Sequence, residues 1–138
     1  MNNRVRIITL FTLLATSFTS LGSYSFDVLA THVSKPIPYL DKNEFHHNET
    51  INLKGWVEYN GQPASDVLVQ VWLEKERDKL TSDNVTSDVN GNFSAILSIP
   101  NDIEPGNYTV SVTSLCQEIH SNVCTYQFEE RQITIRTR

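Results

Sequence analysis

Two cysteines are the residues of this sequence best suited to covalent chemistry. Cys116 and Cys124 are separated by the seven residues QEIHSNV, with His120 between them. Such a pair can close a disulfide, or it can supply two thiolate ligands to a metal ion. One histidine cannot complete a tetrahedral shell, so the metal interpretation needs further ligands. We therefore expect a disulfide, which would restrict the unfolded chain by about 2.5 kcal/mol.

Two other segments have the donor atoms of a metal site. His46 and His47 lie near Glu44 and Glu49, but adjacent residues of an extended chain point in opposite directions. A solvated loop is the alternative for this segment. Residues 88–92, DVNGN, resemble part of a calcium loop, but the bidentate Glu of such loops is missing, and a turn is the alternative. We expect neither a metal nor a cofactor.

Catalytic motifs are missing from the sequence. It contains no Gly-X-Ser-X-Gly elbow, phosphate-binding loop or His-Glu-X-X-His motif, and a disulfide would remove both thiols from chemistry. The acidic residues fall mostly in predicted turns and on predicted solvent faces. We therefore expect that the protein is not an enzyme.

The two tryptophans are candidates for ligand binding. Alternation in their predicted strands directs Trp56 and Trp72 outward, with Leu68 on the same side as Trp72. An exposed Trp56/Trp72 face would suit sugar rings or a partner protein. The alternative is that one indole is covered by the N-terminal strand, by residues 36–40 or by a neighbouring subunit.

Four Asn-X-Ser/Thr triplets could accept glycans in an exported chain. A chain rich in Asn, Ser and Thr also produces such triplets in ordinary surface turns, which is the alternative interpretation. The four acceptors are Asn48, Asn84, Asn92 and Asn107.

The N-terminal segment has the order of a secretory signal peptide. Arg4 and Arg6 precede an apolar run from residue 7 to 21, and small residues follow at Gly22, Ser23 and Ser25. We expect residues 1–25 to be the signal, with cleavage between 22 and 25, and residues 26–138 to be one domain. The apolar run is shorter than a spanning helix needs. An uncleaved anchor, the alternative, would hold the same domain outside the membrane.

The charge of the domain argues against one class of partner. Beyond residue 25, sixteen carboxylates face nine Lys and Arg, a formal charge of −7. No basic stripe remains, so we expect no nucleic-acid partner.

Period-two alternation recurs from residue 26 onward and predicts an all-β domain. We expect strands over residues 26–33, 50–59, 67–74, 93–100, 108–115 and 125–136, and a loop over 41–49. Turns are predicted at Asn60-Gly61, at Pro105-Gly106 and at Asn90-Gly91, the last as a hairpin. In the final strand Tyr126 and Phe128 are out of phase with Ile133 and Ile135, so we predict a β-bulge or bend within residues 129–132. A disulfide would then clamp the hairpin between the last two strands. About seven short strands indicate an antiparallel β-sandwich.

The middle of the chain resembles extracellular immunoglobulin-like modules of the macroglobulin, bacterial Ig-like and carboxypeptidase regulatory-like kinds. The resemblance runs from residue 51 to 114. It rests on the motifs WV (56–57), GQP (61–63), VLVQV (67–71), TSDVNGNF (86–93), IP (99–100) and PGNYTVSV (105–112). It implies an Ig-like β-sandwich, and Tyr108 resembles the tyrosine corner of such domains.

The resemblance implies a spacer, an adhesion unit or an envelope component, since such modules usually have no catalytic activity. We expect an exported structural or adhesion module, extracellular or at the cell surface, which binds a cell-envelope protein or polysaccharide. Strand addition at an open edge is one mode by which it could bind. The alternatives are a carbohydrate-binding module that uses Trp56 and Trp72 and a secreted inhibitor. Any membrane contact would come through an uncleaved N-terminal segment.

Overall fold

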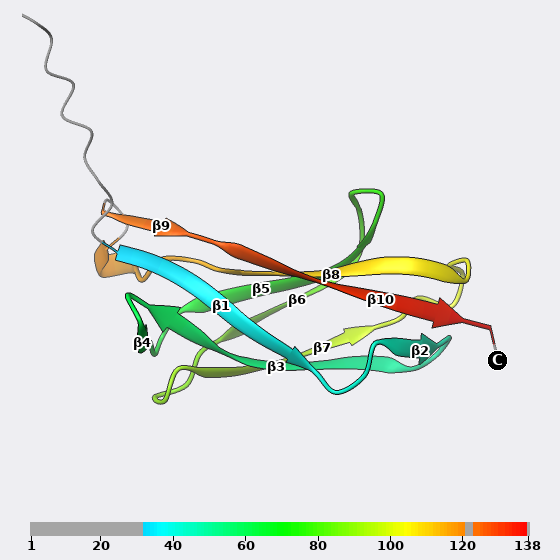
Figure 1. Ribbon diagram of the computed structural model, residues 1–138, viewed down its shortest axis with the longest axis horizontal. Coiled ribbons are helices and arrows are strands. Elements are labelled where there is room, and N and C mark those ends of the chain that lie inside the picture. Colours follow the sequence, from blue (N-terminus) through cyan, green and yellow to red (C-terminus); the bar gives the residue numbers. More distant parts are fainter. Residues whose placement is uncertain (1–31, 121–122, 138) are drawn as a thin grey trace, which may run out of the picture.

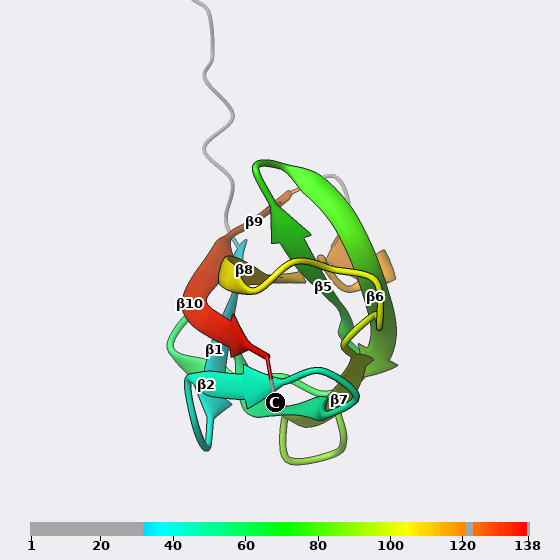
Figure 2. The ribbon, with the colours of Figure 1, turned by 90° about the vertical axis from the view of Figure 1, so that its right-hand side faces the viewer.

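The strands of this domain form two sheets that face each other across one core (Figures 1 and 2). The computed structural model describes residues 32–120 and 123–137. The predicted signal peptide and most of the predicted strand over residues 26–33 lie outside the described residues. The prediction of an all-β sandwich is confirmed.

The first sheet is built around β3, which has partners on both sides. On one side β3 pairs with β1, and β1 pairs in turn with β9. On its other side β3 pairs with β7 and β4. The strands are β1 (His32–Leu40), β3 (Thr50–Tyr59), β4 (Gln62–Pro63), β7 (Asn92–Ser98) and β9 (Cys124–Tyr126).

The second sheet has the order β2-β10-β8-β5-β6. Its pairs are antiparallel except β2 with β10, which is parallel. The strands are β2 (Glu44–His46), β5 (Leu68–Lys75), β6 (Asp78–Thr86), β8 (Gly106–Ser114) and β10 (Phe128–Arg136), and the short 3-10 helix η1 (Glu118–His120) lies between β8 and β9.

Alternating apolar residues build the core, as the sequence predicts. Side chains at every second position of the long strands are buried, because successive residues of a strand point to opposite faces. The buried residues include Ile51, Leu53, Val57, Val69, Val71, Leu73, Phe93, Ala95, Leu97, Tyr108, Val110, Val112, Ile133 and Ile135.

The tyrosine-corner resemblance is supported by a hydrogen bond. The hydroxyl of Tyr108 donates to the carbonyl of Glu104, four residues earlier, while the ring is buried. The aromatic body therefore packs in the core while its polar end is satisfied by the backbone.

The predicted first strand ends at residue 33, but β1 continues through Pro36 and Pro38 to Leu40. The carbonyl of Ser34 accepts from Gln127 N–H, so its backbone points away from β3. By alternation Pro36 and Pro38 point the same way, and β3 loses no donor at these positions. The prolines also leave this edge of β1 without N–H groups at two positions, which protects it against strand addition.

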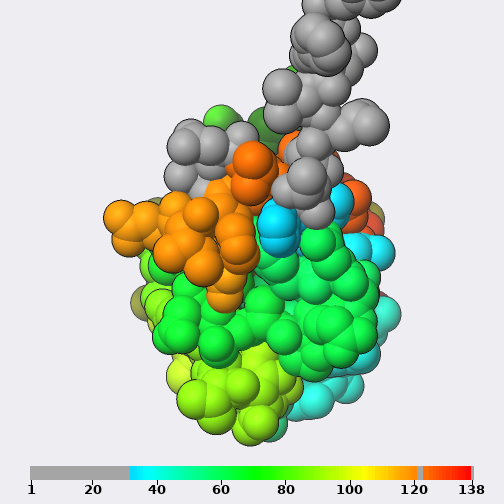
Figure 3. Space-filling view, turned by 90° about the vertical axis from the view of Figure 1, so that its left-hand side faces the viewer, coloured from blue at the N-terminus to red at the C-terminus, as the bar shows by residue number. Residues whose placement is uncertain are grey.

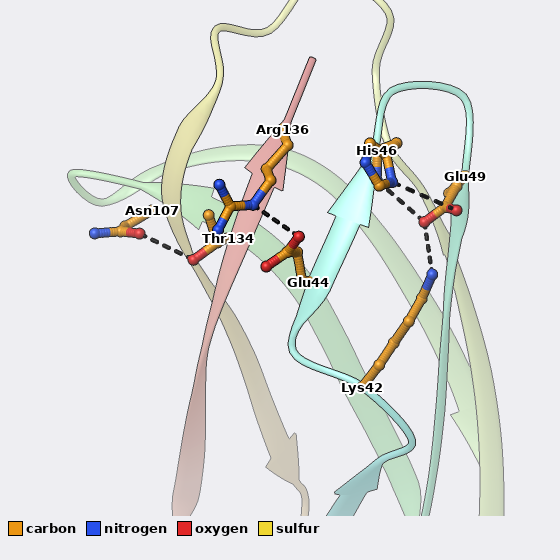
Figure 4. A network of polar contacts seen from close by, with 7 residues as sticks. All are labelled: Lys42, Glu44, His46, Glu49, Asn107, Thr134 and Arg136. Atoms are coloured by element: carbon orange, nitrogen blue, oxygen red, sulfur yellow. Dashed lines mark hydrogen bonds and ion pairs between the residues drawn. The ribbon is translucent and has the colours of Figure 1, made fainter. Parts of the chain in front are cut away.

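The prediction of a loop over residues 41–49 misses β2. Phe45 is buried there, while polar neighbours fasten the strand at its ends (Figure 4). Arg136 of β10 forms an ion pair with Glu44 at 2.7 Å, and Lys42 forms one with Glu49 at 2.7 Å. The hydrogen bonds that Glu49 accepts from Lys42 and from the His46 backbone lower its pKa below the ordinary value.

The polar stretch after β5 contains β6, a strand that the sequence pattern does not predict. Glu76 and Arg77 both have positive φ and form the tight turn of a β5–β6 hairpin. Most of β6 is exposed at the sheet edge, so its sequence lacks an apolar alternation.

Candidate functional site

Trp56 and Trp72 point outward as predicted, but they do not form one face. Trp56 lies on β3 of the first sheet and Trp72 on β5 of the second. Both indoles are partly buried. Because outward directions from two facing sheets are opposite, the interpretation of a shared Trp56/Trp72 face is corrected by the structure.

Trp72 is held in place by Glu74 and Lys79. Its Nε1 donates to Oε2 of Glu74 at 2.8 Å, and the other oxygen of that carboxylate accepts from Ser111 Oγ at 2.9 Å. The Lys79 ammonium lies 3.9 Å from the centroid of the indole ring. These contacts restrict the rotation of the indole, so little side-chain entropy remains to be lost on binding.

Two exposed aromatic rings lie beside Trp72. Tyr126 and Phe128 are 61% and 64% exposed, and both line a hollow on the outer face of the second sheet together with Trp72. We call Trp72, Tyr126 and Phe128 the sheet-two aromatic surface. Exposed aromatic groups that gather in this way mark contact sites more often than isolated apolar residues do.

The predicted β-bulge within residues 129–132 is wrong, and its absence creates this surface. The pairing of β10 with β8 is continuous from Phe128 opposite Thr113 to Ile135 opposite Gly106. Since Ile133 and Ile135 point into the core, uninterrupted alternation sends Phe128 outward. The phase difference was visible in the sequence, but it signalled an exposed ring rather than an irregular strand.

Leu68 lies on the same outer side as Trp72, as predicted, and is 39% exposed. The Leu115 N–H donates to the Leu68 carbonyl at 2.8 Å, which brings the end of β8 next to the start of β5. Leu115 lines the hollow with the aromatic rings. Aliphatic side chains therefore continue the apolar character of the surface toward one end of the sheet.

Cys116 and Cys124 form the predicted disulfide, with their Cα atoms 6.0 Å apart. The simple hairpin expected around it is not formed. After β8 the chain passes through η1, pairs in parallel with β1 as β9, and then returns to the second sheet as β10. The disulfide therefore fastens β9 to the end of β8, two residues before Tyr126.

A cluster of three rings lies at the same end of the domain. His32 stacks on His120 with ring centroids 4.1 Å apart, and the hydroxyl of Tyr59 lies 3.3 Å from Nδ1 of His120. Burial raises the pKa of Tyr59 above its ordinary value. Figure 3 shows the segments of this end packed together, with η1 in orange, the start of β1 in blue and the β3–β4 turn in green.

The calcium-like run over residues 88–92 is a turn in the structure. Oδ1 of Asp88 accepts from the backbone N–H groups of Asn90 and Asn92, at 2.8 and 2.9 Å. The turn joins β6 of one sheet to β7 of the other, so the predicted Asn90-Gly91 hairpin is wrong. Gly91 has φ +80, which explains the glycine at this position.

His46 and His47 are not part of a cluster of described side chains that could bind a metal ion. Among residues 32–120 and 123–137, no three His, Cys, Asp or Glu side chains lie close enough together to hold a metal ion. Nδ1 of His46 instead lies 3.9 Å from Glu49.

No helix within residues 32–120 and 123–137 has the length and apolar character of a membrane span.

All four residues predicted to accept glycans are exposed. Asn48, Asn84, Asn92 and Asn107 therefore stay candidates for modification. Asn107 also accepts a hydrogen bond from Thr134 at 3.2 Å (Figure 4).

Sequence comparison and structure comparison give different results. Neither a family profile nor a curated protein sequence matches this chain. Among solved structures, the D00-D0 domain of intimin is similar, with TM-score 0.55, 16% identity, 81% of this chain covered and 51% of that chain. The chain thus spans about half of that structure.

An engineered protein from the Northeast Structural Genomics Consortium is also similar, with TM-score 0.47, 12% identity and coverage of 73% of this chain and 20% of that chain. The likeness to the intimin domain confirms the Ig-like β-sandwich and concerns the fold alone.

Proposed function

We propose that this domain is a non-catalytic, exported structural or adhesion module of the cell envelope, which binds another protein through the sheet-two aromatic surface. The observation that supports the proposal is the exposure of Tyr126 and Phe128 beside the partly buried indole of Trp72. Aromatic anchors of this kind are enriched at the centres of protein interfaces.

Acidic residues at the rim of the surface favour a basic partner. Glu74 and Glu130 line the same hollow as the rings. The sequence beyond residue 25 also carries a formal charge of −7. A partner with Lys or Arg around an apolar centre would therefore be favoured, because complementary charges accelerate association and exclude wrong partners.

Two features support an extracellular or cell-surface location. The sequence begins with the pattern of a secretory signal, and Cys116 and Cys124 are bonded to each other. Disulfides persist in oxidising compartments and are rare in the cytosol.

Co-sedimentation of residues 26–138 with cell envelopes tests the proposal. We expect Trp72→Ala/Phe128→Ala to bind at least about tenfold more weakly than the wild type, a loss of about 1.4 kcal/mol. Val89→Ala/Ile96→Ala removes two exposed aliphatic side chains that line none of these aromatic hollows, so it is the matched control and should bind normally. Circular dichroism and thermal melting would confirm that both variants fold. Loss of binding in the control alone would contradict the proposal.

A further inference from the structure

The outer face of the first sheet has a second aromatic site, which the proposed function does not use. In the register of the sheet, Trp56 lies between Ile37 of β1 and Asn92 of β7. Tyr39 is one diagonal step from Trp56 and is 58% exposed. Diagonal neighbours on paired strands are about 7–8 Å apart, so the two rings belong to one local surface.

The hollow beside Trp56 combines these rings with hydrogen-bonding groups. Lys54, Asn92 and Ser94 line it together with Trp56 and Tyr39. Aromatic faces with a few polar groups around them are typical of small-ligand sites, where the rings supply contact area and the polar groups fix orientation. A pyranose ring has the matching chemistry, with C–H groups on its faces and hydroxyls at its edge.

Tyr39 also lines a second hollow, on the other side of β1. This hollow includes Asn43, Arg131 and Gln132. Arg131 is fixed by an ion pair with Glu129 at 3.2 Å and by a hydrogen bond to the Pro38 carbonyl. Tyr39 lines both hollows, and we call their lining residues from Trp56 to Gln132 the track. An occupant that contacts both hollows past Tyr39 would be a chain molecule rather than a single sugar.

The charges along the track are balanced. Lys54 and Asp88 line the first hollow. Asp41, Lys42 and Arg131 line the second, and Arg131 is paired with Glu129. Neither an acidic nor a basic occupant gains from this arrangement. The amide groups of Asn43, Asn92 and Gln132 can both donate and accept hydrogen bonds, as sugar hydroxyls require.

We propose that this track binds a linear, uncharged polysaccharide whose pyranose rings stack on Trp56 and Tyr39. The amide side chains along the track would bind the hydroxyl groups. The site is separate from the sheet-two aromatic surface, since the hollows of the two sites share no lining residue. The domain would then hold a polysaccharide on one face and a protein on the other.

Fluorescence titration with cellohexaose and with chitohexaose tests this inference, because the chain has only two tryptophans. Trp72→Phe leaves Trp56 as the single indole, and we expect a saturable fluorescence change with at least one of the two sugars. Trp56→Phe should give no change. By calorimetry, Tyr39→Ala should bind that sugar at least about tenfold more weakly, a clear loss of one stacking ring.

Phe128→Ala is the matched control and should bind the sugar as tightly as the wild type does. No saturation with either hexasaccharide would overturn the inference. So would sugar binding that survives in both Trp56→Phe and Tyr39→Ala. Envelope binding through Phe128 is measured separately, so failure of the sugar site leaves the proposed protein contact unaffected.

Discussion

Gly55→Ala is expected to destabilise the domain by about 3 kcal/mol, at the upper end of ordinary overpacking. A Cβ atom at Gly55 would lie 2.5 Å from the Ile37 carbonyl oxygen and 2.6 Å from Cζ of Phe93. The phenyl ring could rotate, but the carbonyl belongs to the β1–β3 pairing and cannot move without breaking it. Urea denaturation would measure the loss.

A double variant separates the two contacts at this position. Gly55→Ala/Phe93→Leu removes most of the ring contact but leaves the Ile37 carbonyl in place, so it should not restore stability. Ser94→Ala, exposed on the neighbouring strand, is the matched control and should stay within about 0.5 kcal/mol of the wild type. A Gly55→Ala domain as stable as the wild type would show that β1 and β3 are not packed as described.

Removal of the disulfide should cost about 2.5 kcal/mol, because the bond closes a short loop in the unfolded chain. The variant Cys116→Ser/Cys124→Ser would also release β9 from the end of β8. Tyr126 follows the bond by two residues, so binding to the envelope should weaken as well. Thermal melting and co-sedimentation would measure the two effects.

Reduction of the wild-type protein is the control for this variant. Dithiothreitol should lower the melting temperature of the wild type by the same amount as the double substitution, without affecting the double variant. Equal stability of the bonded and unbonded forms would contradict a stabilising role for the bond.

The core strands could be predicted from the sequence because burial of one face imposes a period of two. Val69, Val71 and Leu73 are completely buried, as their alternation indicates. The period carries no information where a strand contributes little to the core. For that reason β6 and β2 were not predicted, although Phe45 of β2 is buried in the core.

Prolines and phase changes were misinterpreted for a common reason. Pro36 and Pro38 are compatible with β1 because they face away from β3, a fact that depends on which neighbours the strand acquires. The phase of Phe128 predicted an irregular strand, but the register with β8 is continuous and directs the ring outward. Sheet partners and register are tertiary properties, which local patterns do not determine.

The candidate site was therefore predictable only in part. Outward directions for Trp56, Trp72 and Leu68 follow from alternation within single strands. The assignment of the tryptophans to different sheets depends on topology. The contribution of Tyr126 depends on β9, a strand of three residues whose pairing with β1 has no separate sequence signal.

Site-specific photocrosslinking on intact envelopes tests the central claim most directly. A benzoylphenylalanine replaces Phe128 in the sheet-two aromatic surface or, as the control, Ile96, which is 58% exposed on the first sheet. We predict a discrete crosslinked protein from position 128 and none from position 96. A crosslinked protein from position 96 alone, with the domain sedimenting normally in both cases, would contradict a protein contact at the sheet-two aromatic surface.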